Sequence, residues 1–180
     1  MNFDKIKKGC VDIIEEEGLK TLFLEKRSLN VKFGVDPTSS DIHLGHTVLL
    51  RKLKEFQELG HNIIFIIGDF TARIGDPSGR TKLRPKLTDS EIKKNARTYT
   101  EQVFCILSPD KTKILYNSSW FEKMSLSSFI NLSFYYTVSR MLERDDFSER
   151  FKEGIPIVVA EFLYPILQGY DSFIVSSDIE

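Results

Sequence analysis

Two histidines, His43 and His46, lie three positions apart at the predicted start of a helix, directly after a strand and an Asp-Pro-Thr loop. The amino terminus of a helix offers free N–H groups and partial positive charge, which favour a bound phosphate. Gly45 has no side chain, so a flat adenine ring could approach the backbone closely. The imidazoles could donate hydrogen bonds to phosphate oxygens while negative charge shifts during phosphoryl or nucleotidyl transfer. These residues therefore favour a nucleotide site that needs no proton transfer.

Two other interpretations of the histidine pair stay open. Histidines at the start of a helix often serve only as caps or packing residues. A zinc ion could also bind His43 and His46 together with a nearby aspartate, since histidines at this spacing can share a metal. The sequence offers no clear third ligand, and a zinc site gives Gly45 no purpose. We therefore expect no metal at this position.

A second cluster, Gly75 to Arg80, follows the second predicted strand. Asp76 lies on the carboxyl side of that strand, where ligands bind in open α/β sheets, and its carboxylate could hold an ammonium group. Four basic residues without an acid among them could fold over a polyphosphate: Arg80, Lys82, Arg84 and Lys86. A turn followed by a solvated basic run explains the same residues equally well.

Tyr164, Gln168 and Asp171 form a third cluster, and their spacing of four and three places them on one helical face. A hydroxyl, an amide and a carboxylate among apolar neighbours are costly to bury without partners. Their partner is either a polar ligand or a network of other protein groups.

The elements that must position these residues begin with a helix, a strand, a loop, a helix and a strand. Apolar spacing predicts a helix within residues 3–24 that ends at Gly18, and a strand over 30–35. A turn-rich loop at 36–41 leads to a helix over 42–59, ended by Gly60, and to an apolar, β-branched strand over 63–67. This order is one βαβ unit and predicts an α/β fold with a Rossmann-like parallel sheet and flanking helices.

The rest of the chain is predicted to be mostly helical. Thr88 and Glu91 form a capping box that opens a helix over 88–107. A third strand at 113–116, a charged helical stretch at 125–150, a break at 154–156 and a last helix at 160–170 follow. The longest apolar run, residues 63–67, is far too short to cross a bilayer, so we expect no membrane association.

The composition is that of an ordinary soluble domain. The formal net charge of −1 over 180 residues does not indicate a nucleic-acid binder, although a local basic patch is compatible with it. Cys10 and Cys105 lie far apart, without the spacing of a zinc finger or of a disulfide scaffold. They predict buried free thiols and a reducing, cytoplasmic location.

Taken together, three stretches resemble the tyrosyl-tRNA synthetases of class I. Residues 33–38 and the His-Leu-Gly-His run resemble the HIGH signature region, and residues 74–79 resemble the next block of that family. Residues 161–171 resemble its tyrosine-binding helix, and their Tyr, Gln and Asp set differs from the corresponding helix of the tryptophanyl enzymes. The blocks stand in family order and span most of the chain.

The resemblance implies a class I catalytic domain that takes ATP (with Mg²⁺), L-tyrosine and tRNA(Tyr). Tyrosine and ATP would give tyrosyl-adenylate and pyrophosphate, and the tyrosyl group would then pass to the 3′ end of the tRNA. The implied catalytic residues are His43 and His46, which would stabilise the ATP phosphates, and Arg80 and Arg84, which would contact pyrophosphate. The implied ATP site comprises these histidines with Asp36, Thr38 and Gly45. The implied tyrosine site comprises Gly34, Asp76, Tyr164, Gln168 and Asp171, with Asp171 accepting a hydrogen bond from the phenol and Asp76, Tyr164 and Gln168 holding the α-ammonium.

The chain departs from the family pattern at Lys32, where well-known bacterial members have a tyrosine that touches the substrate phenol. Asp171 would then carry more of the rejection of phenylalanine. Residues 123–127 imitate the KMSKS loop, but the second lysine is replaced by Leu126 and the run precedes the tyrosine helix. We expect the ribose-binding Gly-Gly-x-Asp-Gln block, the KMSKS loop and the anticodon-binding domain to lie beyond Glu180. The resemblance also implies a helical connective segment at about 120–155 and a homodimer formed through the region near 125–150.

Two alternatives come from other functional classes. A different His-x-Gly-His nucleotidyltransferase, which adenylylates a small metabolite, would not be expected to carry the Tyr164, Gln168 and Asp171 set. A non-catalytic RNA-binding fragment would need a basic stripe with exposed aromatic residues, and the net charge argues against it.

Overall fold

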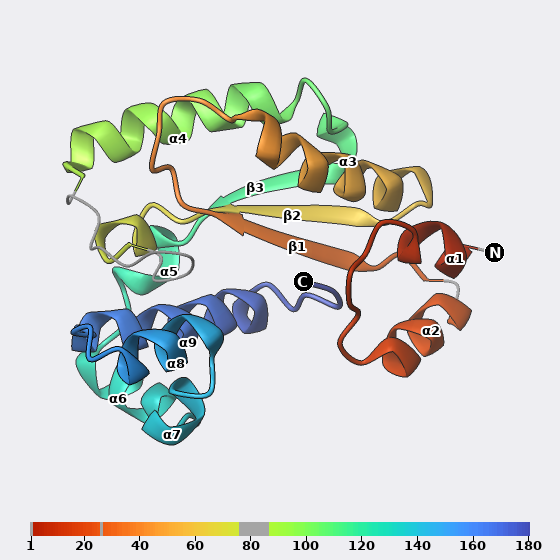
Figure 1. Cartoon of the computed structure of the whole chain (residues 1–180). Coiled ribbons are helices and arrows are strands. Elements are labelled where there is room, and N and C mark those ends of the chain that lie inside the picture. The colour runs from red at the N-terminus through yellow and green to blue at the C-terminus, as the bar shows by residue number, and fades with distance from the viewer. Residues whose placement is uncertain (1, 26, 76–86) are drawn as a thin grey trace.

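The computed structural model describes residues 2–25, 27–75 and 87–180. At its centre lie three parallel strands in the order β1-β2-β3, formed by Asn30–Val35, Asn62–Ile67 and Thr112–Tyr116 (Figure 1). Phe65 in the central strand pairs with Phe33 on one side and Ile114 on the other. β2 is buried from Ile63 onward, as expected for the middle strand of a parallel sheet. The predicted α/β fold with a parallel sheet is confirmed.

The two faces of the sheet have different partners, because successive side chains of a strand point in opposite directions. One face packs into the main apolar core against α1 (Asn2–Lys7), α3 (Leu44–Glu58) and α4 (Asp89–Val103); the core includes Val31, Leu50, Leu53, Phe56, Ile63, Phe65, Ile67, Ala96 and Val103. The other face carries Lys32, Gly34 and Ile66, and these line a pocket together with α9 (Val159–Ile174). Figure 1 shows α3 and α4 on one side of the sheet and α9 on the other.

Helix ends in the first half agree with the local sequence signals. Thr88 and Glu91 form the predicted capping box at α4: the Glu91 carboxylate accepts from the Thr88 N–H at 2.8 Å, and the Thr88 hydroxyl accepts from the Glu91 N–H at 3.3 Å. Gly60 follows α3 with a φ of 96°, a left-handed conformation that glycine adopts without strain. Two short 3₁₀ helices, Thr71–Arg73 and Pro109–Lys111, follow β2 and precede β3.

The first predicted helix is wrong in its extent. The chain forms α1 and a separate α2 (Glu16–Leu24), and Gly18 lies inside α2 instead of ending a helix. The break occurs earlier, where Gly9 adopts a φ of 82° and Glu15 a φ of 61°. The expectation that both cysteines are buried is also wrong, because Cys10 and Cys105 are exposed.

The predicted helical stretch at 125–150 is three short helices, α6 (Leu126–Ser133), α7 (Val138–Met141) and α8 (Asp145–Lys152), preceded by α5 (Ser118–Phe121). Ser125 and Thr137 cap α6 and α7 with their hydroxyls, so each begins as a separate helix. A buried ion pair between Arg150 of α8 and Glu161 of α9 joins this region to the last helix. The assignment of residues 120–155 as a connective insertion stays a prediction.

After α9 the chain returns to the sheet. Ile179 forms a parallel bridge with Val31, its carbonyl accepts from the Lys32 N–H at 2.8 Å, and Asp178 donates its N–H to the Asn30 carbonyl at 2.9 Å. Residues 178–180 therefore run beside β1, on the edge that does not face β2.

Candidate functional site

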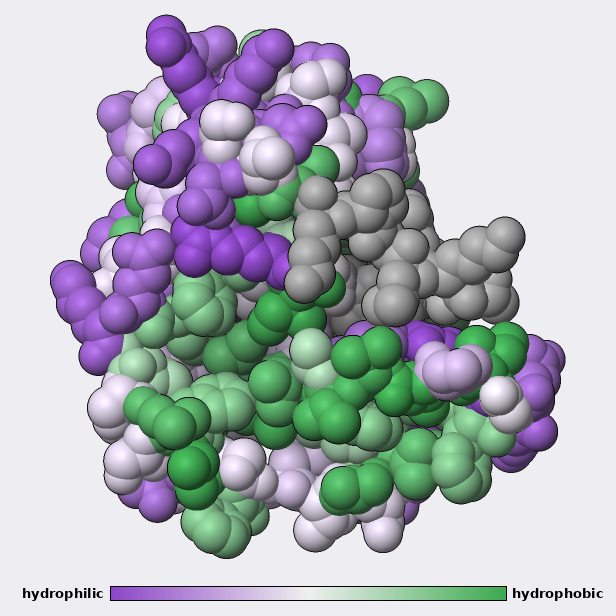
Figure 2. All heavy atoms as spheres, turned by 90° about the vertical axis from the view of Figure 1, so that its left-hand side faces the viewer, coloured by the Kyte–Doolittle hydropathy of each residue, from purple (hydrophilic) through white to green (hydrophobic). Residues whose placement is uncertain are grey.

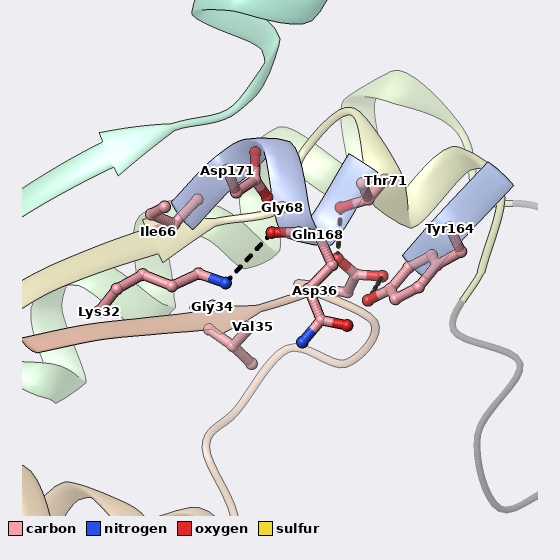
Figure 3. A pocket seen from close by; sticks show the side chains of 10 residues that line it. All are labelled: Lys32, Gly34, Val35, Asp36, Ile66, Gly68, Thr71, Tyr164, Gln168 and Asp171. Carbon is pink, nitrogen blue, oxygen red and sulfur yellow. Dashed lines mark hydrogen bonds between the residues drawn. The ribbon is translucent and has the colours of Figure 1, made fainter. Parts of the chain in front are cut away.

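A pocket lies where β1 and β2 end, between the sheet and α9 (Figure 3). The strands and the turns after them supply Lys32, Gly34, Val35, Asp36, Ile66, Gly68 and Thr71, and α9 supplies Tyr164, Gln168 and Asp171. The three polar residues of α9 therefore share one face, as their spacing predicts, and this face is turned toward β1. The carboxyl end of a parallel sheet is the usual place for ligands in open α/β folds.

Asp36 is the hydrogen-bonding centre at one end of the pocket. Its carboxylate accepts from the Tyr164 hydroxyl at 3.1 Å and from the Thr71 hydroxyl at 2.7 Å (Figure 3). Gly68 makes room for this arrangement: a Cβ atom there would lie 2.1 Å from Asp36 Oδ1 and 2.4 Å from Thr71 Oγ1. The position after β2 must therefore be glycine if the Asp36 carboxylate is to stay where it is.

Asp171 lies on α9 and is only 5% exposed. Its carboxylate accepts from Trp120 Nε1 at 2.9 Å and from Asn117 Nδ2 at 3.2 Å. Burial raises the pKa of Asp171 to about 6, against the lowering effects of Asn117, Trp120 and Lys32. A carboxylate has about four acceptor positions, so two remain for a ligand.

Asn117 links the two carboxylates of the pocket. It donates to Asp171 and, at 3.1 Å, to the Thr71 hydroxyl, which in turn donates to Asp36. Sequence reasoning missed Thr71, Asn117 and Trp120. The available signal for Asn117 was its place directly after β3, at the same edge of the sheet as Asp36.

Gln168 is exposed, and its amide donates to Glu180 at 3.1 Å. Glu180 also accepts from Lys32, whose side chain is only 1% exposed. The ion pair between Lys32 and Glu180 was not predicted from the sequence.

His43 and His46 stand at the start of α3, as predicted. His43 is the N-cap residue, and its Nδ1 accepts from the Gly45 N–H at 3.1 Å; His46 Nδ1 accepts from the His43 N–H at 3.3 Å. A neutral imidazole that accepts at Nδ1 carries its hydrogen on Nε2, so both rings have a donor left for a ligand. Partial burial, and secondarily the charge of His43, lower the pKa of His46, which favours its neutral form at pH 7.

The loop that presents these histidines is held by α4. Asn95 donates to the Pro37 carbonyl at 3.0 Å, Gln102 accepts from the Ile42 N–H at 2.7 Å, and the Tyr99 and Ser39 hydroxyls lie 3.0 Å apart. Thr38 lies in this loop, with its N–H donated to the Asp36 carbonyl at 2.8 Å. The amphipathic face of α4 thus positions the segment between β1 and α3.

Other predicted site residues, Asp76, Arg80 and Arg84, lie outside the described residues. Within the described ranges, no three His, Cys, Asp or Glu side chains gather in a way that could hold a metal ion. Among the same residues, no helix has the length and apolar content that a membrane crossing requires.

Comparison with known proteins gives consistent matches. The family described as tRNA synthetases class I (W and Y) matches residues 24–180. The tyrosine–tRNA ligases of Thermotoga maritima and Aquifex aeolicus are each 56% identical over 175 residues, which are 97% of this chain and 44% and 45% of those relatives. A C-terminally truncated mitochondrial tyrosyl-tRNA synthetase of Aspergillus nidulans superposes with a TM-score of 0.80 at 26% identity, over 97% of this chain and 52% of that one.

The chain spans less than half the length of the curated relatives it matches. The match to the family covers the sheet, the α3 amino terminus with its histidines, and the pocket beside α9. The chain therefore belongs to the class I tRNA synthetases of the tryptophan and tyrosine group.

Proposed function

We propose that the protein containing this chain is a tyrosine–tRNA ligase: it activates L-tyrosine with ATP, releases pyrophosphate, and transfers the tyrosyl group to the 3′ end of tRNA(Tyr). The observation that carries the proposal is the convergence of Tyr164, Gln168 and Asp171 with Gly34 and Asp36 in one pocket at the carboxyl end of the sheet. Relatives at 56% identity bear the name tyrosine–tRNA ligase, which supports the choice of amino acid.

Tyrosine has a phenol at one end and an ammonium group at the other, and the pocket has matching polar groups. We place the phenol at Asp171, since this buried carboxylate accepts from Asn117 and Trp120 and a carboxylate has about four acceptor positions. We place the α-ammonium at Tyr164 and Gln168, together with Asp76. Gly34 is exposed although it lies in the sheet, so the floor of the pocket is open to a flat ring.

ATP belongs at the start of α3 in this proposal. The Nε2 donors of His43 and His46 would stabilise the phosphates as charge develops, and Gly45 would lie under the adenine. Asp36 and Thr38 would line the nucleotide pocket, while Arg80 and Arg84 would contact pyrophosphate. ATP would bring Mg²⁺ with it, and we expect no tightly bound metal. Orientation of both substrates in one cleft would supply much of the rate.

We also propose a homodimer, formed through the region near residues 125–150, that acts in the cytoplasm. Figure 2 shows hydrophobic residues gathered over the half of the molecule that contains α6 to α9. Large apolar side chains exposed there include Leu126, Phe134, Tyr135, Val138 and Val159. Beside them, Phe70, Ile74, Phe121, Met124 and Phe129 line an apolar groove. Exposed apolar surface of this kind marks an interaction site, and sedimentation of the full-length protein tests the dimer.

Amino-acid-dependent ATP–pyrophosphate exchange tests the proposed function. We expect the full-length protein to catalyse exchange with tyrosine and not with tryptophan or phenylalanine.

Replacing Tyr164 with Phe should raise the KM for tyrosine, because one contact to the ammonium is lost. Exchange driven best by another amino acid, or by none, would contradict the proposal.

A further inference from the structure

Tyr99 is a fully buried tyrosine in α4. It is 1% exposed and lies on the helix face that also buries Ile92, Ala96 and Val103. A buried hydroxyl is costly unless it has a hydrogen-bond partner. A phenylalanine would fill the same space without this requirement, so the partner of the Tyr99 hydroxyl shows what the residue does.

The partner of Tyr99 is Ser39, in the loop that connects β1 to α3. The two hydroxyl oxygens lie 3.0 Å apart, and Ser39 Oγ also donates to the Asp41 carbonyl at 3.0 Å. Because a serine hydroxyl has one hydrogen, Tyr99 is the donor to Ser39. Tyr99 therefore ties the middle of this loop to α4, along which the loop passes in Figure 1.

Two further side chains of α4 tie the ends of the same loop. Asn95 donates to the Pro37 carbonyl at 3.0 Å, and Gln102 accepts from the Ile42 N–H at 2.7 Å. Positions 95, 99 and 102 are spaced four and three apart, so they share one side of the helix. The loop is thus held at three points, and Tyr99 is the middle one.

The ring of Tyr99 also contacts His46. The two ring centroids are 6.1 Å apart and the ring planes are inclined by 65°, an edge-to-face arrangement. His46 Nδ1 accepts from the His43 N–H at 3.3 Å, so these two contacts fix the plane of the imidazole and the direction of its Nε2 donor. Tyr99 is not one of the described residues that line the pocket beside α9.

We propose that Tyr99 is a positioning residue for the activation step: its ring orients the Nε2 donor of His46 toward the phosphates of ATP, and its hydroxyl holds the preceding loop. This inference rests on the proposed function and names the residue of α4 through which the helix sets the rate of adenylate formation. A misplacement of about 1 Å far from the chemistry can reduce a rate about 100-fold. The rate should therefore depend on Tyr99, whereas the affinity for tyrosine should not.

The test uses two variants of the full-length protein in tyrosine-dependent ATP–pyrophosphate exchange. Tyr99→Leu removes the ring contact and the hydroxyl, and we expect kcat to fall about 10- to 100-fold. Tyr99→Phe keeps the ring and loses one neutral hydrogen bond, so kcat should fall only about two- to tenfold. Titration calorimetry should give an unchanged Kd for tyrosine in both variants.

A double-mutant cycle shows whether the ring acts through His46. His46→Ala removes the imidazole that Tyr99 contacts, so Tyr99→Leu and Tyr99→Phe should have the same kcat in that background. If Tyr99→Leu still falls below Tyr99→Phe by the original factor, the ring is only structural and the inference is wrong. A kcat of Tyr99→Phe equal to that of the unmodified protein would contradict the role of the hydroxyl, whether or not Tyr99→Leu folds.

Tyr116→Phe is the matched control for the lost hydroxyl. The Tyr116 hydroxyl lies 3.3 Å from that of Thr100, the next residue of α4, and its loss should leave kcat unchanged. Val103→Ala controls for lost core packing, since Val103 is a fully buried residue of the same helix. A fall in kcat as large as that of Tyr99→Leu would show that any loosening of α4 suffices and would overturn the inference. If the unmodified protein shows no exchange with tyrosine, the proposed function fails and the inference falls with it.

Discussion

If tyrosine binds as proposed, the charge of Asp171 controls how well the pocket accepts its phenol. Burial raises the pKa of this carboxyl to about 6, above its ordinary value of 3.8. A phenol donates best to the ionised form, so affinity for tyrosine should fall about tenfold from pH 7 to pH 5, as one proton is taken up. Titration calorimetry across this range measures it. Asp171→Asn should bind tyrosine weakly with no such pH dependence; an unchanged pH profile in this variant would exclude Asp171 as the cause.

The raised pKa of Asp171 affects folding stability in the opposite direction: stability falls as pH rises, whereas tyrosine binding should improve. Because the folded-state pKa is the higher one, the folded chain holds the proton more tightly, and stability is lost as pH rises from about 4 to about 6. The shift of this pKa corresponds to roughly 3 kcal/mol in the free energy of unfolding. Ionised Asp171 therefore destabilises the folded chain. Asp171→Asn should remove this part of the pH dependence of urea unfolding.

Gly68 offers a second test at the scale of one residue. Gly68→Ala would place a Cβ 2.1 Å from Asp36 Oδ1, so the Asp36 carboxylate must move and its bonds to Thr71 and Tyr164 must break. We expect a loss of tyrosine binding and a destabilisation of about 1–3 kcal/mol. Gly169→Ala is the control, since no atom lies within 4 Å of its added Cβ. Normal binding by Gly68→Ala would contradict the described place of Asp36.

At the scale of elements, α9 is held in place by the buried pair of Arg150 and Glu161. Glu161 also accepts from the Val158 N–H at 2.9 Å, and Arg150 donates to the Pro156 carbonyl. Burial alone would raise the pKa of Glu161, but Arg150 and the Val158 N–H outweigh it and lower the pKa. Arg150→Met leaves a buried carboxylate without its partner and should cost about 3–5 kcal/mol in urea unfolding.

Arg140→Met is the matched control for that prediction. Arg140 pairs with Glu143 on the surface, where both side chains are more than half exposed. Such a pair contributes little, and its loss should change unfolding by less than about 1 kcal/mol. Equal effects of the two substitutions would show that α9 does not depend on the buried pair.

Elements with a strong local signal were predicted well from the sequence. The β-branched run of β2 and the Thr88–Glu91 capping box each specify an element without help from distant residues. The division of α1 from α2 was not predicted, because Glu15 adopts a left-handed conformation for which its residue type has no preference.

Candidate site residues were likewise predictable only where local spacing determines their placement. The common face of Tyr164, Gln168 and Asp171 was predictable, because helical spacing decides it. Asn117 and Trp120 were missed, since only the folded chain brings them from the end of β3 to α9. The partner of Lys32 was missed for the same reason, as Glu180 returns to the sheet over a long sequence separation.

At the scale of the whole molecule, this chain spans less than half of its curated relatives. Adenylate formation requires ATP to be held at its base, ribose and phosphates together. Because the chain spans less than half of those relatives, we expect the 180-residue chain alone to show far less tyrosine-dependent exchange than a protein of the relatives' length. Full exchange by the 180-residue chain would show that these residues suffice for the chemistry.

A crystal structure of the full-length protein with L-tyrosine tests whether the pocket between β1 and α9 binds tyrosine, as proposed. We expect the phenolic oxygen within hydrogen-bonding distance of Asp171, with the α-ammonium near Tyr164 and Gln168. Tyrosine bound elsewhere, or with its ammonium at Asp171, would show that this pocket does not bind the substrate as proposed.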